Sequence, residues 1–430
     1  MVVTGRALHA PVRGVLEMFD AAFVVDEGGT IVEIGRAEAA AGQVLMPGMV
    51  DLHVHAPQFP QMGQALDVPL WQWLQEKTFP LEARYADPAF AAEVYARLVD
   101  CLLDNGTTTA VYFATIHLAA TQALAEICLK AGQRALVGRV AQDDAGQCPD
   151  WYRDASAEVA EAETRALIAH VRGMAGNEAG LVRPVITPRF IPACTDDLLA
   201  RLGRLALESG CHVQTHCSES DWEHGYVRDR CAMSDTAALA GFGLLGRHTV
   251  LAHGVFVSEA DAGVIRAAGS GIAHCPLSNA YFADAVFPLR RMLDAGVNVG
   301  LGTDVAGGAS PSVLESARHA VTASRQLESG VDARVEAGAR GCAGARVSAA
   351  EAFWLATAGG GEVLDLPVGV FRVGYQFDAI RVAGGGAASN LRLEAEDGAQ
   401  DVLQKVIYTA GRQDICDVWV AGRRVGGTGS

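Results

Sequence analysis

The chain has 430 residues, half of them hydrophobic and 20% charged, which is the composition of a globular protein rather than a disordered one. Its formal net charge of −16 at pH 7 argues against a nucleic-acid duplex or an anionic membrane surface as the partner. No apolar run approaches the roughly 20 residues of a membrane span, and the N-terminus has no secretory-signal pattern, so we expect a cytoplasmic protein without a membrane partner. The ten cysteines form no Cys-x-x-Cys pair and are expected to be reduced thiols.

Short strand-like segments separated by turns lie at both ends of the chain. Neither end carries enough apolar residues to form a core by itself. We therefore predict one small composite β-sandwich domain, built from residues 1–45 and 365–430. Its predicted strands include residues 21–25, 31–34, 377–382 and 418–425.

Strand-like and helix-like segments alternate through the remaining part, residues 46–364. Repeated strand-then-helix units predict parallel strands, and closing such a series gives a (β/α)8 TIM barrel, an α/β fold. An open doubly wound sheet is the alternative, but the first strand is not followed by the Gly-rich phosphate turn that such a sheet needs. Helices are expected over 90–103 and after an N-cap at Thr195, up to residue 209. The eight predicted strands are 44–54, 107–114, 135–140, 182–188, 213–216, 249–253, 271–274 and 297–301.

The first predicted barrel strand ends in Asp51-Leu52-His53-Val54-His55. Successive side chains of a strand point to opposite faces, so His53 and His55 share one face. Two imidazoles side by side at a strand end can bind one divalent cation. A single His-x-His pair is weak support for a metal site, so the other strand ends decide the interpretation.

Three later strand ends carry residues of the same kind. They are His216, with Glu219 three residues on, then His253, and then Asp304 in Gly-Leu-Gly-Thr-Asp. The C-terminal ends of barrel strands meet at one mouth, so we expect these side chains to converge there. Histidine nitrogens and a carboxylate suit a single Zn²⁺ or Fe²⁺ with one position left for water.

Such a metal favours attack of water on a carbon that bears an amino group, and this reaction needs a proton carrier. Glu219 is the candidate carrier. Asp304 can hold the water and accept its proton, and His253 can hydrogen-bond to the attacking oxygen.

The lysines indicate how many metal ions to expect. Barrel hydrolases with two metals usually bridge them through a carboxylated lysine on the fourth strand, whereas the three lysines here are Lys77, Lys130 and Lys405. None lies near 182–188, so a mononuclear site is predicted. The deaminase type that uses H-x-E with P-C-x-x-C is excluded, because the sequence has no Cys-x-x-Cys.

Further sequence blocks surround these motifs, and with them the chain resembles the amidohydrolase superfamily and, within it, the guanine deaminase family. The likeness runs from about residue 47 to 361. The blocks are Leu-Gln-Glu-Lys-Thr-Phe-Pro at 74–80, Asn-Gly-Thr-Thr-Thr-Ala at 105–110, Tyr-Phe-Ala-Thr-Ile-His at 112–117, Ile-Thr-Pro-Arg-Phe at 186–190, Ala-His-Cys-Pro-Leu-Ser-Asn at 273–279 and Gly-Thr-Asp-Val-Ala-Gly-Gly at 302–308.

The resemblance implies hydrolysis of guanine to xanthine and ammonia in purine catabolism, by a homodimer with one Zn²⁺ per subunit. Fe²⁺ is the alternative metal. By resemblance Glu219 shuttles the proton and His253 lies near the metal. The implied metal ligands are His53, His55, His216 and Asp304, and the implied substrate contacts are Gln58, Arg189, Phe190 and Glu219.

The chemistry of guanine agrees with these residue types. Arg189 can donate to the carbonyl oxygen of guanine, and a substrate without that oxygen would leave the guanidinium unpaired. The amide of Gln58 can both donate and accept along the edge of the ring. Phe190, and with it Trp71 or Trp73, could stack on the purine face.

Two other functions remain open at this point. One is a related aminohydrolase that acts on another purine, a pterin or an s-triazine. The other is a metal-free structural protein on the same barrel, although such relatives typically lose the histidines and the aspartate that are present here.

Overall fold

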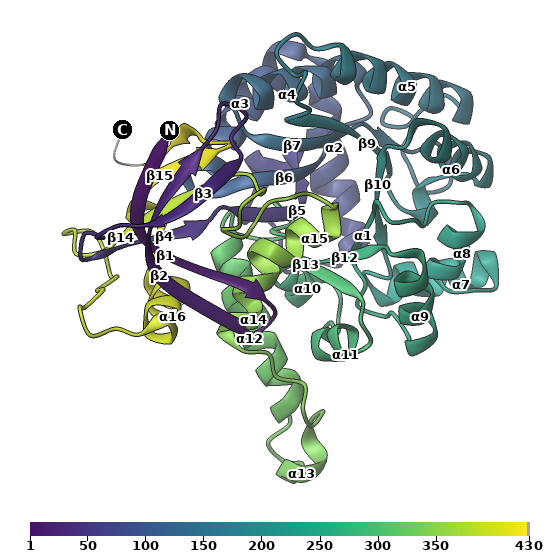
Figure 1. Ribbon diagram of the computed structural model, residues 1–430. Coiled ribbons are helices and arrows are strands. Elements are labelled where there is room, and N and C mark those ends of the chain that lie inside the picture. The colour runs from purple at the N-terminus through teal and green to yellow at the C-terminus, as the bar shows by residue number, and fades with distance from the viewer. Residues whose placement is uncertain (428–430) are drawn as a thin grey trace.

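The computed structural model describes residues 1–427 and shows a barrel of parallel strands with a second sheet beside it (Figure 1). Backbone hydrogen bonds join the first strand to the segment after the last one: Asp304 N donates to His53 O at 2.8 Å, and His55 N donates to Val305 O at 2.9 Å. The predicted TIM barrel is confirmed. In order around it, the strands are β5 (Met49–His55), β6 (Thr107–Phe113), β7 (Arg134–Gly138), β9 (Val182–Pro188), β10 (His212–Cys217), β11 (Thr249–His253), β12 (Gly271–His274) and β13 (Asn298–Leu301), and β8 (Val140–Ala141) pairs with β9.

The barrel strands are buried on both faces, as parallel strands covered by helices must be. All seven residues of β5 and of β6 are buried. Close packing between the first and last strands depends on glycine. A Cβ at Gly300 would lie 2.5 Å from the side chain of Leu52, and one at Gly302 would lie 2.9 Å from the Cβ of His53.

The helices that cover the barrel begin and end close to the predicted positions where the caps are explicit. The Asp87 side chain accepts from Ala89 N at the start of α3 (Pro88–Asp104), and Thr195 accepts from Leu198 N at the start of α6 (Asp196–Ser209). The other helices of this part are α1 (Leu70–Trp73), α2 (Phe79–Ala83), α4 (Leu118–Ala131), α5 (Ala157–Gly173), α7 (Asp221–Cys231), α8 (Asp235–Gly241), α9 (Glu259–Ala268), α10 (Pro276–Phe282), α11 (Leu289–Asp294), α12 (Val313–Ser329), α13 (Ala337–Arg340), α14 (Ala349–Trp354) and α15 (Gly360–Leu364).

Both ends of the chain contribute strands to the second sheet, as predicted (Figure 1). Antiparallel pairing of β4 with β14 joins the N-terminal strands to the C-terminal ones. The limits 1–45 with 365–430, and 46–364, stay a prediction for the two domains. The seven strands, in sheet order, are β16 (Arg423–Gly426), β15 (Ile415–Val420), β14 (Ala379–Ala383), β4 (Gln43–Pro47), β1 (Val2–Val12), β2 (Val15–Val25) and β3 (Ile31–Arg36), with α16 (Ala399–Thr409) beside them.

Two predicted strands are each two strands in the structure. The predicted strand 44–54 breaks at Gly48 into β4 and β5, which belong to different sheets. Gly48 N still donates to Asp378 O, next to β14 of the small sheet, whereas Met49 N donates to Gly106 O, next to β6 of the barrel. The predicted strand 418–425 breaks at Ala421 and Gly422. Both have positive φ, 45° and 75°, which is the backbone of a tight hairpin turn between β15 and β16.

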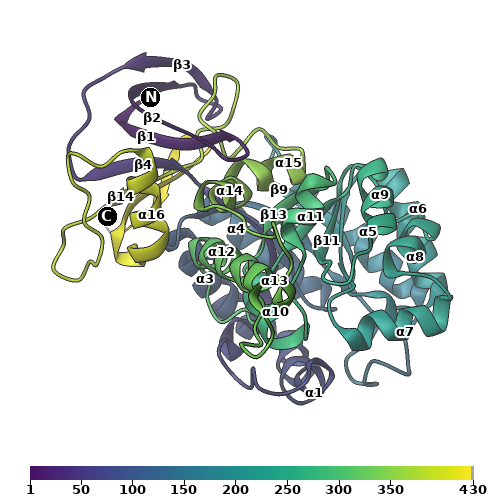
Figure 2. The ribbon, with the colours of Figure 1, turned by 90° about the horizontal axis from the view of Figure 1, so that it is seen from below.

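A buried ion pair connects the small sheet to the start of the barrel strands. Arg134, the first residue of β7, donates from Nε to Asp378 Oδ2 at 2.9 Å and from Nη2 to Oδ1 at 3.2 Å. The small sheet therefore lies at the N-terminal ends of the strands, and Figure 2 shows it at the opposite end of the molecule from α1. This arrangement leaves the C-terminal mouth of the barrel to the βα loops.

Two further sequence expectations concern the chain as a whole. The ten cysteines all lie within residues 1–427 and none of them forms a disulfide, in agreement with the expected reduced thiols. No helix in that range combines the length and the apolar character that a membrane crossing needs.

We expect the substitution Asp378→Ala to lower the free energy of unfolding by about 3–5 kcal/mol, because it leaves a buried guanidinium without its partner. Urea denaturation of the whole chain measures this effect. Asp332→Ala removes the carboxylate of an ion pair in which the Arg334 side chain is 90% exposed, and serves as the control with an unchanged midpoint. Equal midpoints for the two variants would contradict this role of the buried pair.

Candidate metal and substrate site

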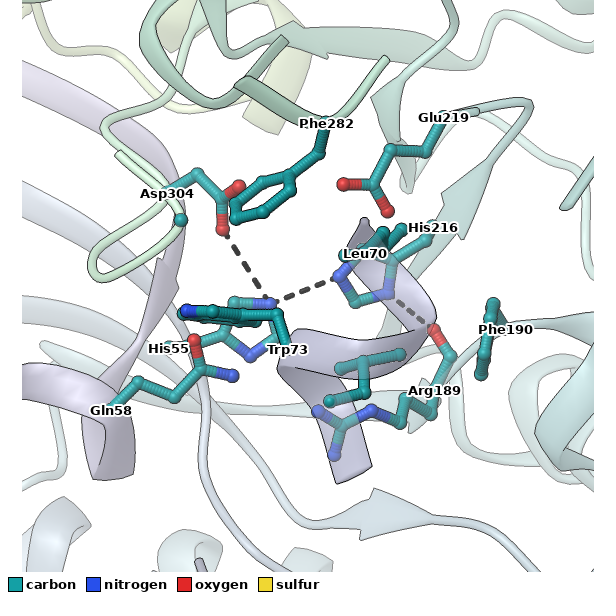
Figure 3. Close-up of a pocket in the computed structure, with 12 residues that line it drawn as sticks. His55, Gln58, Leu70, Trp73, Arg189, Phe190, His216, Glu219, Phe282 and Asp304 are labelled. Atoms are coloured by element: carbon teal, nitrogen blue, oxygen red, sulfur yellow. Dashed lines mark hydrogen bonds and ion pairs between the residues drawn. The ribbon is translucent and has the colours of Figure 1, made fainter. Parts of the chain in front are cut away.

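The side chains predicted to bind a metal converge at the mouth of the barrel (Figure 3). Asp304 Oδ1 lies 3.2 Å from His53 Nε2 and 3.6 Å from His55 Nε2. The Nε2 atoms of His55 and His216 are 3.0 Å apart, and His253 Nε2 lies 3.9 Å from Asp304 Oδ2. Residues up to 251 positions apart in the sequence thus form one cluster, as predicted from their strand ends.

Local backbone structure explains why these side chains face one another. His53 and His55 alternate along β5. His253 is the last residue of β11, and Asp304 lies three residues after the end of β13. They have φ of 73° and 50°, a left-handed conformation that is uncommon for residues with a Cβ and is concentrated at functional sites. The Asp51 carboxylate fixes the last turn by accepting from Thr303 N at 2.9 Å and Thr303 Oγ1 at 2.6 Å.

The Nδ1 atoms of two imidazoles have partners that point Nε2 toward the cluster. His216 Nδ1 donates to the backbone oxygen of Arg189 at 2.5 Å, and His253 Nδ1 donates to Asn279 Oδ1 at 3.0 Å. The proton on Nδ1 leaves Nε2 with a free lone pair, which is the ligating form of histidine. The sequence analysis did not assign this role to Asn279.

Burial favours the uncharged imidazoles that a metal needs. It lowers the pKa of His53, His55 and His216 well below the usual value of histidine, and neighbouring imidazoles add to this effect. Burial also raises the pKa of Glu219 well above its usual value, and the nearby carboxylate of Asp304 raises it further. These effects favour the protonated form of this carboxyl, from which it can donate a proton.

Unpaired buried atoms show that the cluster fits a cation. Within residues 1–427, Nε2 of His53 and Nε2 of His253 are buried and have no hydrogen-bond partner. Buried polar atoms are normally paired, so such atoms call for a missing partner. The donor set of neutral imidazoles and a carboxylate suits a divalent ion. Three trios have ligand atoms within 4.8 Å of one another: His53, His216 and His253; His53, His55 and Asp304; and Glu219, His253 and Asp304.

A pocket opens directly beside this cluster, and the three predicted substrate contacts Gln58, Arg189 and Phe190 all line it (Figure 3). Glu219 lines it as well, with Oε1 at 3.6 Å from His253 Nε2. The predicted acid and the predicted substrate contacts thus share one cavity with the metal cluster. Its apolar lining consists of Leu70, Trp73, Leu74 and Phe282, together with Phe190.

The two tryptophans that were predicted as candidates for stacking differ in the structure. Trp73 is buried, lines the pocket and packs on Phe282 with ring centroids 5.2 Å apart. Trp71 is 54% exposed and does not line this pocket, so its stacking role was wrong. One helical turn separates buried Leu70 and Trp73, while Trp71 faces outward between them.

Glu82 is a functional candidate that the sequence analysis missed. It is fully buried and forms an ion pair with Arg189, with Nη1 to Oε2 at 2.7 Å. It also accepts a hydrogen bond from Gln58 Nε2 at 2.9 Å. The block 74–80 ends two residues before Glu82, and no spacing in the sequence indicates that an acid on this helix reaches a residue of the fourth strand end.

Comparison with known proteins places the chain in a family. Residues 44–425 match the model of the Amidohydrolase family. The chain belongs to this family. It is 37% identical to a probable guanine deaminase of Schizosaccharomyces pombe, over 99% of this chain and 83% of that protein, and 36% identical to the guanine deaminase of Homo sapiens, over 90% and 84%.

Solved structures of guanine deaminases are similar along the whole chain. One, from C. acetobutylicum with guanine bound in its active site, has a TM-score of 0.88 and 28% identity and covers 98% of this chain and 99% of that one. Another, from E. coli, has a TM-score of 0.87 and 29% identity with 99% of each chain covered. Barrel and small sheet thus both have counterparts in these proteins.

We expect His216→Ala to abolish binding of the metal, because it removes one of the buried imidazoles of the predicted ligand set. Metal analysis of the purified variant measures this: the parent protein should carry about one equivalent, as a mononuclear site does, and the variant much less. His170→Ala, on the outer helix α5, is the control and should keep the metal. Full metal content in the His216 variant would exclude this residue as a ligand.

Proposed function

We propose that this chain is a guanine aminohydrolase, which hydrolyses guanine to xanthine and ammonia. The observation that carries the proposal is the pocket, in which the guanidinium of Arg189 and the amide of Gln58 lie next to a His/Asp cluster and a protonatable acid. The similar proteins and solved structures given above are named guanine deaminases, which supports the proposal.

The purine is recognised along one edge. Arg189 donates to the carbonyl oxygen of guanine, and the amide of Gln58 pairs with the adjacent ring nitrogen. Phe190 contacts the ring face. Adenine has no oxygen at the corresponding position, so its binding would leave buried donors unpaired, which costs about 1–3 kcal/mol for each group.

Zinc is the proposed metal, one ion per subunit with Fe²⁺ as the alternative, held by His53, His55, His216 and Asp304. When bound, such an ion lowers the pKa of a water molecule from roughly 15.7 to about 7 and so makes a nucleophile available at neutral pH. Asp304 and His253 orient the attacking oxygen by hydrogen bonds.

Glu219 moves the proton. The water oxygen attacks the carbon that carries the amino group, and Glu219 accepts a proton from this water. It then delivers the proton to the amino nitrogen, the carbon–nitrogen bond breaks and ammonia leaves, so that the ring keeps the new oxygen as xanthine. The carboxyl ends the cycle in the state in which it began, as a general acid–base must.

The wider biology follows from the same proposal. We infer a homodimeric, cytoplasmic enzyme of purine catabolism, as the resemblance of the sequence implies. Guanine is its small-molecule partner.

Turnover on a substrate panel tests the proposal. Ammonia release should be fastest from guanine and much slower from adenine, cytosine and melamine. Adenine and melamine lack the oxygen that pairs with Arg189, and cytosine has no hydrogen on the ring nitrogen between its carbonyl and its amino-bearing carbon. 8-Oxoguanine keeps the recognised edge and shows how far the pocket tolerates change on the other ring. Release from adenine but not from guanine would overturn the proposal in favour of a different aminohydrolase.

We expect Glu219→Gln to retain the metal and to lose turnover by about 10²–10⁴-fold, because neither the water nor the amino group then has a proton carrier. Steady-state kinetics and metal analysis on the same preparation separate the two effects. The control is Asp221→Asn, which alters an exposed acid two residues away. Near-normal turnover of the metal-loaded Glu219 variant would remove this residue from the mechanism.

A further inference from the structure

Glu82 links the two polar side chains that line the pocket. Its side chain is fully buried, and its two oxygens accept four hydrogen bonds. Arg189 donates from Nη1 to Oε2 at 2.7 Å and from Nη2 to Oε1 at 3.2 Å. Gln58 Nε2 donates to Oε1 at 2.9 Å, and the hydroxyl of Tyr152 donates to Oε2 at 2.6 Å. The carboxylate therefore has no capacity left for a ligand and acts only through its neighbours.

The first consequence concerns Arg189. Three of its hydrogen bonds lie within the protein: Nη1 donates to Glu82 and, at 3.4 Å, to Gln142 Oε1, and Nη2 donates to Glu82. A guanidinium has five N–H groups, so among residues 1–427 the Nε–H and one N–H of Nη2 remain for a ligand. Burial by itself lowers the pKa of Arg189, but the adjacent carboxylate raises it above the usual value, and the pair is neutral overall.

The second consequence concerns Gln58. An ionised carboxylate only accepts hydrogen bonds, so the NH₂ end of the amide has to face Glu82 and the carbonyl end has to face away from it. In Figure 3 the nitrogen of Gln58 points toward Arg189 and the oxygen points to the side of His55. Ala306 N also donates to Oε1 of Gln58, at 3.4 Å. Gln58 therefore presents an acceptor to the pocket.

The helical segment that carries Glu82 also contributes to the wall of the pocket. The helices α1 and α2 are joined by a π-helical turn, Leu74–Thr78, ahead of Pro80, which has no amide hydrogen to continue an α-helical ladder. The same helix supplies Leu70 and Trp73 to the pocket. The ring of Phe79 lies 5.0 Å from the guanidinium carbon of Arg189 and covers the ion pair from one side.

We propose that Glu82 is a positioning residue that makes the pocket selective for a purine edge with a carbonyl oxygen next to a ring N–H. The remaining donors of Arg189 match the oxygen, and the fixed carbonyl of Gln58 matches the N–H. In a purine whose ring nitrogen at that position carries no hydrogen, the lone pair of this nitrogen would face the carbonyl oxygen of Gln58, and two acceptors cannot form a hydrogen bond. This inference rests on the proposed function and adds the origin of its specificity.

A second buried pair shows what a purely structural role looks like. Arg134 and Asp378 form an equally buried, two-pronged ion pair, with Nε to Oδ2 at 2.9 Å and Nη2 to Oδ1 at 3.2 Å. Neither residue lines the substrate pocket, and the pair lies at the opposite end of the strands. Asp378→Asn is therefore a matched control for Glu82→Gln.

The test compares guanine with 2-aminopurine. Both carry the amino group that is hydrolysed, but 2-aminopurine has no 6-oxygen and no hydrogen on the adjacent ring nitrogen. In Glu82→Gln the new amide can donate as well as accept, so Gln58 can turn its NH₂ to the ligand. We expect kcat/KM for guanine to fall about 100-fold and that for 2-aminopurine to fall less than about 3-fold, as the loss of hydrogen bonds to charged groups predicts.

Controls separate positioning from general damage. Metal content of the Glu82→Gln variant should stay equal to that of the parent protein. Asp378→Asn should lower the unfolding midpoint and should leave the ratio of kcat/KM for guanine to kcat/KM for 2-aminopurine unchanged. Glu82→Asp keeps the charge but is too short to reach both Arg189 and Gln58, so it should lower the ratio by at least about 3-fold, which gives a second measurement if the glutamine variant does not fold.

The inference would be overturned if a folded, metal-loaded Glu82 variant kept the parent ratio of kcat/KM for guanine to kcat/KM for 2-aminopurine. This holds whether neither value changes or both fall by the same factor. A failure of this inference can be told apart from a failure of the proposed function. If the parent protein releases no ammonia from guanine, the proposed function fails first and the role of Glu82 fails with it. If the parent protein acts on guanine, only the comparison of variants decides about Glu82.

Discussion

The site depends on the contact between the first and the last strand of the barrel. Two backbone hydrogen bonds link His53 O to Asp304 N and His55 N to Val305 O, so three residues of the metal cluster also take part in closing the barrel. The side chain of Asp51 adds hydrogen bonds to Thr303 at the same seam. The backbone hydrogen bonds that close the barrel consequently also set the distance between Asp304 and the two histidines His53 and His55.

A second buried network lies around this centre and serves recognition. The histidines are oriented by backbone and side-chain acceptors, His216 by Arg189 O and His253 by Asn279. Arg189 thus takes part twice, because its backbone oxygen orients a histidine and its side chain faces the pocket. Arg189 and Glu82 form an ion pair whose net charge is zero. The pocket therefore selects its ligand by the direction of hydrogen-bond donors and acceptors more than by charge. Such a pocket fits a neutral heterocycle.

The sequence predicted the architecture and the metal cluster because both depend on local patterns. Alternating strands and helices indicate a barrel, and residues at strand ends meet at its mouth whatever the loops between them do. The strand limits were wrong at Gly48, because an apolar run continues across the point where the chain passes from one sheet to the other. They were also wrong at Ala421, where a tight turn joins two neighbouring strands of the same sheet.

The recognition network was only partly predictable. Gln58, Arg189 and Phe190 came from resemblance, and the structure places all three in the pocket. Glu82 could not be inferred, because its partners lie 24 and 107 positions away and no periodicity connects them. Trp71 and Trp73 differ by two positions, and only the helix phase decides which one faces the cavity.

The central claim is that side chains from three strand ends hold one catalytic metal at the mouth of the barrel. Anomalous X-ray diffraction from crystals of the zinc-loaded protein, recorded at the zinc absorption edge, tests it most directly. The account predicts a single strong peak about 2.0–2.2 Å from Nε2 of His53, His55 and His216 and from the carboxylate of Asp304. A peak at any other place, or no peak at this cluster in protein that hydrolyses guanine, would contradict it.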